Sequence, residues 1–334
     1  MERKLGAAVI GLGMMGQGHA RIWSELPQTE LLAVYDIDPE RTNALSEQYG
    51  LEPCGSIEAA LNTPGVDFVS ICTDDQSHVD PCLLAAREGK HILVEKPLAT
   101  TVEDADTIIE ACSEQGVKLM VGHVVRFDPR YQVARQAIEA GEVGDIIQVY
   151  ARRNNWLSSG ERIGPRTSVA FFLGCHDLDL MRWFCGCDVR RVYAEGASKA
   201  LAHLGVEDSI FTVMKFDNGA AGCLETCWAV PNTQPNALDA RLEVVGTLGR
   251  VAVRVGSEEL EITGADGARR ADFTYGPIIH DRQYGALRAE LEHFVRCVVT
   301  EEEPLITPAD ARAAVELCVA IHRSLETGQP VVLP

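Results

Sequence analysis

The chain has 334 residues, enough for two domains at roughly 100–200 residues each. Its 46% hydrophobic and 24% charged residues are typical of a globular protein. The formal net charge of −19 disfavours nucleic acid and anionic membrane surfaces as partners, because their phosphates would be repelled. No apolar run approaches the roughly 18–20 residues of a membrane-spanning helix, and the apolar run that follows Arg3 and Lys4 leads into a glycine pattern instead of a cleavage site. We therefore expect a cytoplasmic protein.

Eleven cysteines are present, and none of them forms a CxxC pair. Most lie inside apolar runs, as Cys72, Cys112 and Cys318 do. Cysteines in such surroundings behave as small buried hydrophobes. We therefore predict reduced thiols and no metal site, with a zinc site or a disulfide framework as the alternative.

The first 120 or so residues alternate between apolar strands and helical stretches. The strands are expected at 5–13, 30–36, 67–73, 91–97 and 118–123, and the helices at 14–26, 39–50, 78–89 and 102–116. The strands are rich in Val, Ile and Leu without polar alternation, which indicates burial on both faces and therefore a parallel sheet. Residues 1–125 are thus predicted to form a doubly wound α/β domain, the Rossmann arrangement.

The pattern changes in residues 126–334. We first expect a helix at 131–141, a strand at 145–153, a polar loop and a helix at 168–184. Strands then follow at 189–198, 208–216, 219–229, 240–246, 249–255 and 260–264. Two helices end the chain, one at 281–299 and one from 307. Asp217-Asn218-Gly219 is a hairpin signal. Consecutive strands of this kind predict a second, α+β domain with a large, mostly antiparallel open sheet.

A glycine loop follows the first expected strand and opens the first helix: Gly11-Leu12-Gly13-Met14-Met15-Gly16. The GxGxxG pattern is weak alone, but here an acid, Asp36, ends the second strand 20 residues after Gly16. Gly11 suits the tight turn, Gly13 the close approach of a pyrophosphate, and Gly16 the packing of helix on strand. The whole loop is therefore predicted to bind a dinucleotide at the helix N-terminus.

Asp36 selects between the two nicotinamide cofactors. Its carboxylate would hydrogen-bond the ribose hydroxyls of NAD and repel the 2′-phosphate of NADP. Arg41 lies in the following helix and could reach the same place, which leaves NADP as the less favoured alternative. A purely structural helix cap is the other interpretation of Asp36.

Glu95-Lys96-Pro97 ends the strand expected at 91–97. Ligands of open α/β sheets bind beyond the carboxyl ends of the strands, so Lys96 should point into the nicotinamide crevice. Pro97 biases Lys96 towards an extended backbone. A surface lysine at a strand end is the alternative.

At this point the sequence resembles the glucose–fructose oxidoreductase, inositol dehydrogenase and MocA family. Five segments carry the resemblance in the family's order: the glycine loop, the EKP tripeptide, GHVVRFDP at 122–129, HDLDLMRW at 176–183, and the closing stretch from HFV at 293–295 to the C-terminus. The resemblance implies a substrate-binding and oligomerisation role for 126–334. It also implies that Lys96 and His176 are the catalytic pair, and that a cis bond precedes Pro97.

The chemistry of such a pair suits alcohol oxidation. A histidine with a reference pKa near 6.5 can take the hydroxyl proton at neutral pH, and the Lys96 cation would stabilise a developing alkoxide. Without the resemblance, His176 would be interpreted as a core histidine. Many family members carry an aspartate four residues before this histidine, and here Phe172 stands in that position. Another group must then orient His176, and Asp177 and Asp179 are the neighbouring acids in the sequence. Alternatively, Lys96 takes a larger share of the proton transfer.

Further contacts follow from the resemblance. Thr73 and His78 occupy the family's loop beside the nicotinamide ribose, although His78 could instead cap a helix, and Asp74 and Asp75 replace the usual Pro and Asn. Glu95 is expected to contact the cofactor as well. The remaining candidates for the substrate pocket are His123, Arg126, Trp156, Phe172 and Asp177, with Asn155, Arg162 and Arg166 possible from position alone.

The leading hypothesis is an NAD-dependent dehydrogenase that oxidises a ring hydroxyl of a cyclitol or sugar by reversible hydride transfer. One alternative is an NADPH-dependent reductase of a keto-sugar or imine. Another is a nicotinamide-binding sensor without turnover, an alternative that Phe172 keeps open. The resemblance also implies a homodimer or homotetramer that pairs through the open sheet.

Overall fold

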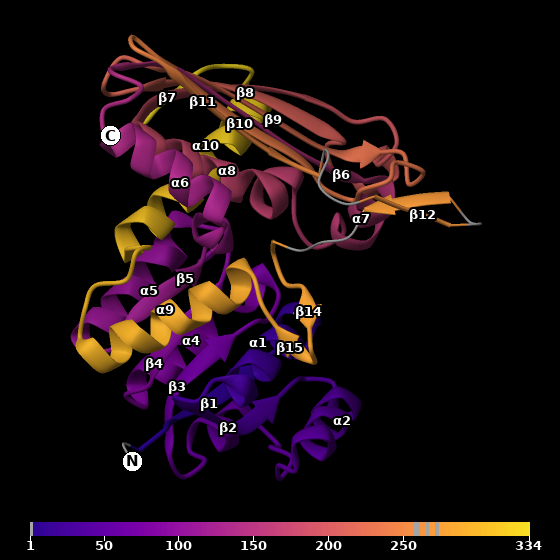
Figure 1. Ribbon diagram of the computed structural model, residues 1–334, viewed down its shortest axis with the longest axis vertical. Helices are drawn as coiled ribbons and strands as arrows, with labels where there is room; N and C mark the ends of the chain where they lie inside the picture. Colours follow the sequence, from indigo (N-terminus) through magenta and orange to yellow (C-terminus); the bar gives the residue numbers. More distant parts are fainter. Residues whose placement is uncertain (1–2, 257–260, 265–266, 271–273) are drawn as a thin grey trace. The chain divides into compact units, whose positions relative to one another are not determined.

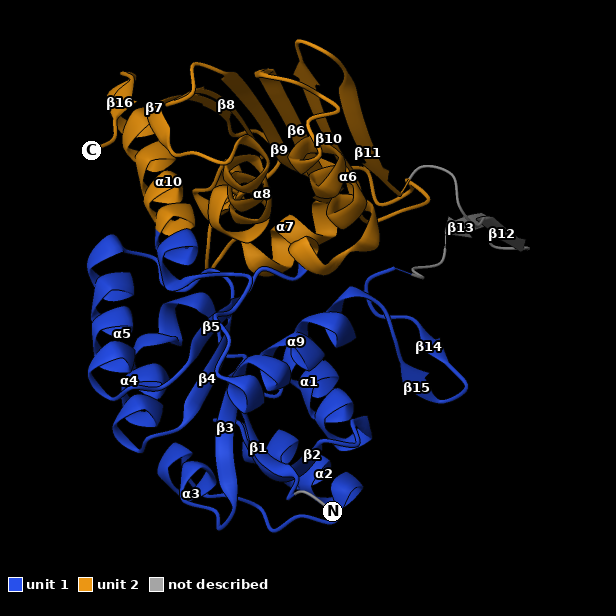
Figure 2. Ribbon diagram, turned by 60° about the vertical axis from the view of Figure 1, so that its left-hand side comes forward, with its two compact units in different colours: residues 1–124, 274–312 blue, residues 125–273, 313–334 orange. Residues whose placement is uncertain are grey.

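The computed structural model describes residues 3–256, 261–264, 267–270 and 274–334. They form two compact units (Figures 1 and 2). The first comprises Met1–Val124 with Thr274–Arg312, and the second Val125–Phe273 with Ala313–Pro334. Residues 274–312, which the sequence placed in the second domain, therefore pack with the first unit.

The first unit is built on a five-stranded, fully parallel sheet in the order β2-β1-β3-β4-β5. The strands are β1 Leu5–Ile10, β2 Thr29–Tyr35, β3 Val66–Ile71, β4 His91–Glu95 and β5 Leu119–Gly122. The inner strands are buried almost continuously, as their apolar runs predicted. From β1 the chain proceeds to β2 on one side, and β3 lies on the other side of β1, so the order reverses at β1 and β3. Ligands bind at the carboxyl ends of strands at such a switch point.

Helices cover both faces of this sheet. Their bounds are α1 Met14–Glu25, α2 Pro39–Tyr49, α3 Ile57–Leu61, α4 Val79–Arg87, α5 Val102–Glu114 and α9 Ala286–Thr300. The helix α9 packs beside α1, while α4 packs against both α3 and α5 (Figure 2). Right-handed crossovers in opposite directions from β1 and β3 put α1 and α4 on opposite faces. The doubly wound prediction is confirmed.

A short hairpin precedes α9, where the sequence predicted a helix from residue 281. Its strands are β14 Ile278–Ile279 and β15 Arg282–Gln283. His280 and Asp281 form its turn with φ angles of 49° and 60°, the positive values of a two-residue hairpin turn. The Gln283 N–H donates to Glu25 of α1 at 3.0 Å, which anchors the hairpin on the first unit.

The second unit carries a seven-stranded sheet in the order β11-β10-β6-β9-β8-β7-β16. The strands are β6 Ile146–Trp156, β7 Val189–Ala197, β8 Ser209–Phe216, β9 Ala221–Val230, β10 Asp239–Gly246, β11 Arg250–Val255 and β16 Val331–Val332. The pair β6–β9 is parallel, and the other described pairs are antiparallel. This confirms the mostly antiparallel sheet.

Helices cover one face of this sheet, and the hydrophobic core of the unit lies between the sheet and these helices (Figure 2). The helices are α6 Pro129–Glu139, α7 Leu157–Ile163, α8 Cys175–Cys185 and α10 Pro308–Thr327. Trp228 of β9 and Phe184 of α8 are among the fully buried side chains. The opposite face carries alternate, more exposed residues such as Phe211 and Val213 of β8.

Two segments of the second unit differ from the prediction, and a third agrees with it over the described residues. The strand expected at 145–153 continues to Trp156, and α7 lies in the expected loop. The helix expected at 168–184 is instead a π-helix, Ala170–Gly174, followed by α8. The strand expected at 260–264 is β12 Glu261–Gly264, paired with β13 Gly267–Arg270, while residue 260 lies outside the described residues.

All eleven cysteines are free thiols, as predicted. Among the described residues, no helix combines the length and apolarity needed to cross a membrane, and no cluster of three or more His, Cys, Asp or Glu side chains is arranged to hold a metal ion.

Candidate functional site

The glycine loop is shaped by contacts that exclude side chains. Gly11 has a φ of +86°, and a Cβ there would lie 2.6 Å from the Cys72 backbone. A Cβ on Gly16 would lie 1.8 Å from the Gly11 carbonyl oxygen, so α1 packs on β1 only through glycine. Gly13 differs, because a Cβ there would meet nothing within 4 Å. The N-terminus of α1 is therefore open at Gly13, which fits the approach of a pyrophosphate.

Asp36 closes this loop from the end of β2. One carboxylate oxygen accepts the Leu12 N–H at 2.6 Å, and the other accepts the Asp38 N–H at 2.9 Å. Arg41, more than half exposed, places Nη1 3.8 Å from the same carboxylate. Asp36 thus lies beside the loop, as the motif predicted, with its oxygens held by backbone donors. These residues and the open helix end fit an NAD adenosine ribose and pyrophosphate.

The turn after β4 is tied to the loop after β3. The Lys96–Pro97 peptide bond is cis, in agreement with the family resemblance. His78 is buried, with Nδ1 2.8 Å from the Pro97 carbonyl and Nε2 3.2 Å from the Thr73 carbonyl. Burial lowers the pKa of His78 against the opposing effect of these carbonyls. A neutral ring has one N–H, and the shorter contact assigns it to Pro97. His78 therefore joins the loop at Thr73 to the turn at Lys96.

Glu95, the residue before Lys96, belongs to a buried hydrogen-bond network that no sequence motif indicated. Glu95 Oε1 is 3.2 Å from Nε2 of His19, whose Nδ1 is 3.0 Å from the Ser70 hydroxyl. Burial raises the pKa of Glu95, but the His19 hydrogen bond and the charges of His19 and Lys96 outweigh it, so the net shift is downward. Glu95 is thus a buried carboxylate, and no direct cofactor contact is needed to explain it. The histidine three residues after Gly16 was the available signal.

In the second unit, the HDLD segment of α8 places two acids in buried ion pairs. Arg153 of β6 approaches Asp177 with Nε–Oδ2 at 2.5 Å and Nη2–Oδ1 at 3.2 Å. Arg126 approaches Asp179 in the same bidentate way, at 2.8 and 2.6 Å. Asp177 and Arg126, both expected in the substrate pocket, are therefore engaged in salt bridges that fix α8. His176, in the first turn of α8, is half-buried.

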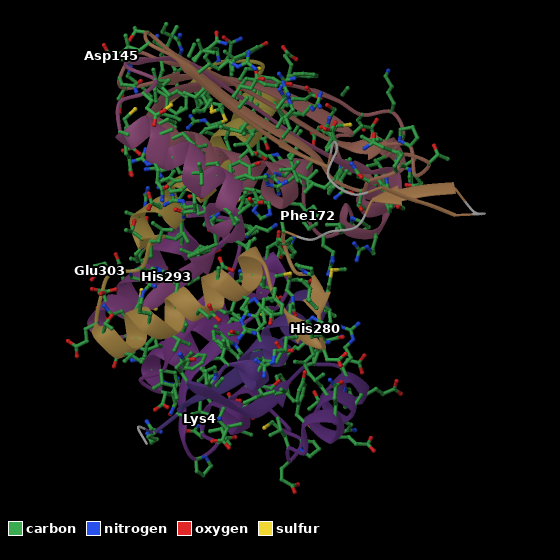
Figure 3. The ribbon with its side chains drawn as sticks, viewed as in Figure 1. Lys4, Asp145, Phe172, His280, His293 and Glu303 are labelled. Atoms are coloured by element: carbon green, nitrogen blue, oxygen red, sulfur yellow. The ribbon has the colours of Figure 1, made fainter. Side chains whose placement is uncertain are left out.

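Phe172 lies in the π-helix one turn before His176 (Figure 3). Its half-buried ring packs against the core of the unit, 6.4 Å from the Trp228 ring centre. The chain is therefore π-helical, not α-helical, where the family carries an aspartate. Such π-bulges are frequent at functional sites.

The remaining candidates divide between the units. His123 is buried directly after β5 in the first unit. Trp156 ends β6 in the second and donates its Nε1–H to the Gln234 carbonyl at 3.1 Å. Within the first unit the structure brings together the glycine loop, Asp36, Thr73, His78, Glu95 and Lys96 at the carboxyl ends of the strands. Met14 is exposed and Met15 contacts the Tyr275 hydroxyl at 3.2 Å.

Comparison with known proteins gives consistent results over the whole chain. Residues 5–123 match an oxidoreductase family with an NAD-binding Rossmann fold, and residues 131–252 match the GFO/IDH/MocA C-terminal domain. A scyllo-inositol 2-dehydrogenase (NAD(+)) of Bacillus subtilis strain 168 is 32% identical, over 100% of this chain and 97% of its own length. A myo-inositol 2-dehydrogenase of Thermotoga maritima is 28% identical over 97% of both chains. The solved structure of GenD2 from gentamicin A biosynthesis, in complex with NAD, superposes with a TM-score of 0.84 at 26% identity, covering 100% of this chain and 97% of that one.

The two glycines of the loop should respond differently to a methyl group. Gly13→Ala has open space and an ordinary φ of −66°, so its unfolding midpoint should match wild type, while NADH affinity should fall by about tenfold or more because the methyl group occupies the path of the pyrophosphate. Gly16→Ala should instead destabilise the first unit. Fluorescence titration with NADH and urea unfolding of both variants check this. Equal NADH affinity in Gly13→Ala and wild type would place the dinucleotide elsewhere.

Asp177 should prove to be a stabilising residue. Asp177→Asn leaves the buried Arg153 cation without its counter-charge, which costs about 3–5 kcal/mol in comparable cases. We expect a lower urea midpoint and unchanged NADH affinity. Asp188→Asn, which affects a pair with Arg182 whose carboxylate is 66% exposed, is the matched control and should change stability by less than about 1 kcal/mol. A fully stable Asp177→Asn protein with a changed substrate KM would restore Asp177 to the substrate pocket.

Proposed function

Because the chain belongs to the GFO/IDH/MocA oxidoreductase family, we propose that it is an NAD-dependent dehydrogenase that oxidises a ring secondary hydroxyl of a cyclitol or related sugar. The observation that carries the proposal is the assembly in one unit of the open glycine loop, Asp36 and the cis Lys96–Pro97 turn. Full-length similarity to two inositol 2-dehydrogenases supports the substrate class.

Asp36 supports NAD as the cofactor. Two backbone N–H groups hold its carboxylate at the edge of the loop, and a carboxylate in that place repels a 2′-phosphate. Arg41 lies beside Asp36 and Asp38, so its charge is shared with these acids and is poorly placed to favour NADP.

We propose Lys96 and His176 as the catalytic residues. A bound NAD would supply the acceptor for the hydride that leaves the substrate carbon. Lys96, a cation at the end of β4, stabilises negative charge that develops on the substrate oxygen. The His176 imidazole takes the hydroxyl proton, because histidine is the side chain most often used for acid–base catalysis near neutral pH. His78 holds the Lys96 turn through the Pro97 carbonyl and thereby keeps the lysine in position.

Phe172 changes how this proton transfer is arranged. A phenyl ring neither accepts a hydrogen bond from an imidazole nor stabilises its positive charge. The two acids that follow in α8, Asp177 and Asp179, are engaged by arginines. We therefore propose that either another group orients His176, or Lys96 in its uncharged form takes a larger share of the proton than in relatives with the aspartate.

A panel of cyclitols and sugars with NAD, followed at the NADH absorbance at alkaline pH, tests the function. We expect turnover with at least one inositol isomer and a clear preference for NAD over NADP. Lys96→Ala should reduce turnover by about a hundredfold or more, with NADH affinity within severalfold of wild type.

Lys90→Ala is the matched control, because this lysine lies on the same unit at the opposite end of β4 and bonds the Val66 carbonyl. It should retain turnover. Strong NADP preference would favour the NADPH-dependent reductase. Tight NADH binding without turnover on the whole panel would favour a sensor.

We further propose that the open face of the seven-stranded sheet pairs with a second copy of the chain. Phe211 and Val213 are each more than half exposed on this face. Charged side chains of both signs lie on the same sheet: Glu225 is the cross-strand neighbour of Phe211 on β9, and Arg241 and Glu243 lie on β10. A face of mixed sign can pair with its own copy around a twofold axis, which is the commonest symmetry of oligomers. The eleven free thiols also support a reducing compartment, the cytoplasm, as the place of action.

Light scattering should give a dimer or tetramer at micromolar concentration. Phe211→Glu with Val213→Asp should yield a folded protein of lower mass, because charges of the same sign on both copies would have to be buried in the pair. Val299→Asp, at an exposed position of α9, is the control and should leave the mass unchanged. A wild-type monomer would refute the oligomer and leave the enzymatic proposal untouched.

A further inference from the structure

A second buried carboxyl group lies near Glu95, the residue that precedes Lys96. Glu290 of α9 is fully buried, and neither carboxylate oxygen has a hydrogen-bond partner among the described residues. An ionised carboxylate in that position would lose its hydration without replacement, a cost of several kcal/mol. The α9 helix belongs to the same compact unit as the glycine loop, and it packs on α1 (Figure 2).

Glu95 lies close enough to Glu290 for its charge to act on that group, and hydrogen bonds hold Glu95 as the anion. The indole N–H of Trp23 donates to the Ser70 hydroxyl at 2.9 Å, and Ser70 is 3.0 Å from Nδ1 of His19. An indole N–H can only donate and a carboxylate can only accept, so Trp23 and Glu95 fix the two ends of this chain of hydrogen bonds. Gly122 of β5 lets the backbone lie against this carboxylate, since a Cβ there would be 3.1 Å from Glu95 Cδ.

The two carboxyls therefore have opposite surroundings. His19 and the Lys96 N–H, at 3.2 and 3.3 Å, stabilise a charge on Glu95. Burial and the charge of Glu95 raise the pKa of Glu290 well above its usual value. The thiol of Cys72, which follows β3, is affected by both carboxyls, and burial and their charges raise its pKa. Arg288, which lies two residues before Glu290, pairs with Glu25 of α1 at 3.2 Å.

We propose that Glu290 is an uncharged carboxylic acid that, with Glu95, keeps a single negative charge behind Lys96, and that this pair is a positioning device for dinucleotide binding. The inference rests on the proposed function, because it assigns the pair to the cofactor side of that site. Two ionised carboxylates would repel each other in a dry interior and would oppose the anionic pyrophosphate at the neighbouring loop. One proton on Glu290 removes that repulsion while Glu95 still neutralises Lys96.

The proton on Glu290 can be observed directly. The infrared spectrum of wild-type protein at neutral pH should contain a carboxylic-acid carbonyl band above the amide I band, and this band should be absent in Glu290→Gln. Glu292→Gln, two residues further along α9 with a half-exposed side chain, is the matched control and should keep the band. Absence of the band in wild type, or its persistence in Glu290→Gln, would overturn the proposal.

Stability against pH provides a second readout. Since the folded-state pKa of Glu290 is raised, wild type loses stability as pH rises from the unfolded value near 4.3 through the folded value. Glu290→Gln keeps the shape of the neutral acid without that loss. Its urea midpoint should therefore equal wild type near pH 4 and exceed it increasingly at higher pH. A variant less stable than wild type at every pH would show that Glu290 is ionised and paired.

Cofactor affinity tests the positioning role. NADH affinity of wild type should fall by about tenfold more than that of Glu290→Gln between neutral and alkaline pH, the order expected for one added charge in a partly buried site. Effects of pH that do not involve Glu290 act on both proteins and cancel in this comparison. Parallel curves would overturn the positioning role. If wild type bound no NADH, the proposed function would fail, while the infrared and unfolding readouts would still report on Glu290.

Discussion

The candidate cofactor site depends on the contact between Gly16 of α1 and the carbonyl of Gly11. Because no Cβ fits in that contact, α1 begins directly against β1, and its N-terminus is aimed at the switch point of the sheet. Asp36 then reaches the Leu12 N–H, and the backbone beyond β3 passes beside Gly11. The anion-binding end of a helix is thereby placed where three strands end.

The turn at Lys96 uses the same end of the sheet in a different way. Lys96 lies in this turn, and buried polar contacts hold the residues on either side of it: Glu95 with His19, and Pro97 with His78. Buried polar networks are stabilising only when each member has a partner. Glu290 departs from that rule, and a proton resolves the departure at lower cost than a charge would. The buried hydrogen bonds of Glu95 and Pro97 thus fix the geometry of the Lys96 turn.

In the second unit, electrostatics fix a helix instead of a turn. Arg153 and Arg126 form bidentate ion pairs with two acids of α8, Asp177 and Asp179 respectively. These pairs anchor the helix that carries His176 to β6 and to the segment after β5. Removing one partner from such a pair is costly, which makes these residues unsuited to exchange for a substrate contact. The π-helix before α8 gives Phe172 to the core, where the family has an acid.

The sequence by itself determined the doubly wound fold, the glycine loop, the place of Asp36 and the position of Lys96, because these follow from local patterns of apolar runs, glycines and strand ends. It did not reveal the hairpin before α9, the membership of residues 274–312 in the first unit, or the partners of Asp177 and Glu290. Those depend on contacts between residues far apart in the chain: Glu290 meets Glu95 across almost two hundred positions, and Arg153 lies 24 residues before Asp177. No local period records whether a buried acid will meet an arginine or another acid, because the partner comes from a distant part of the chain that only the tertiary structure brings near.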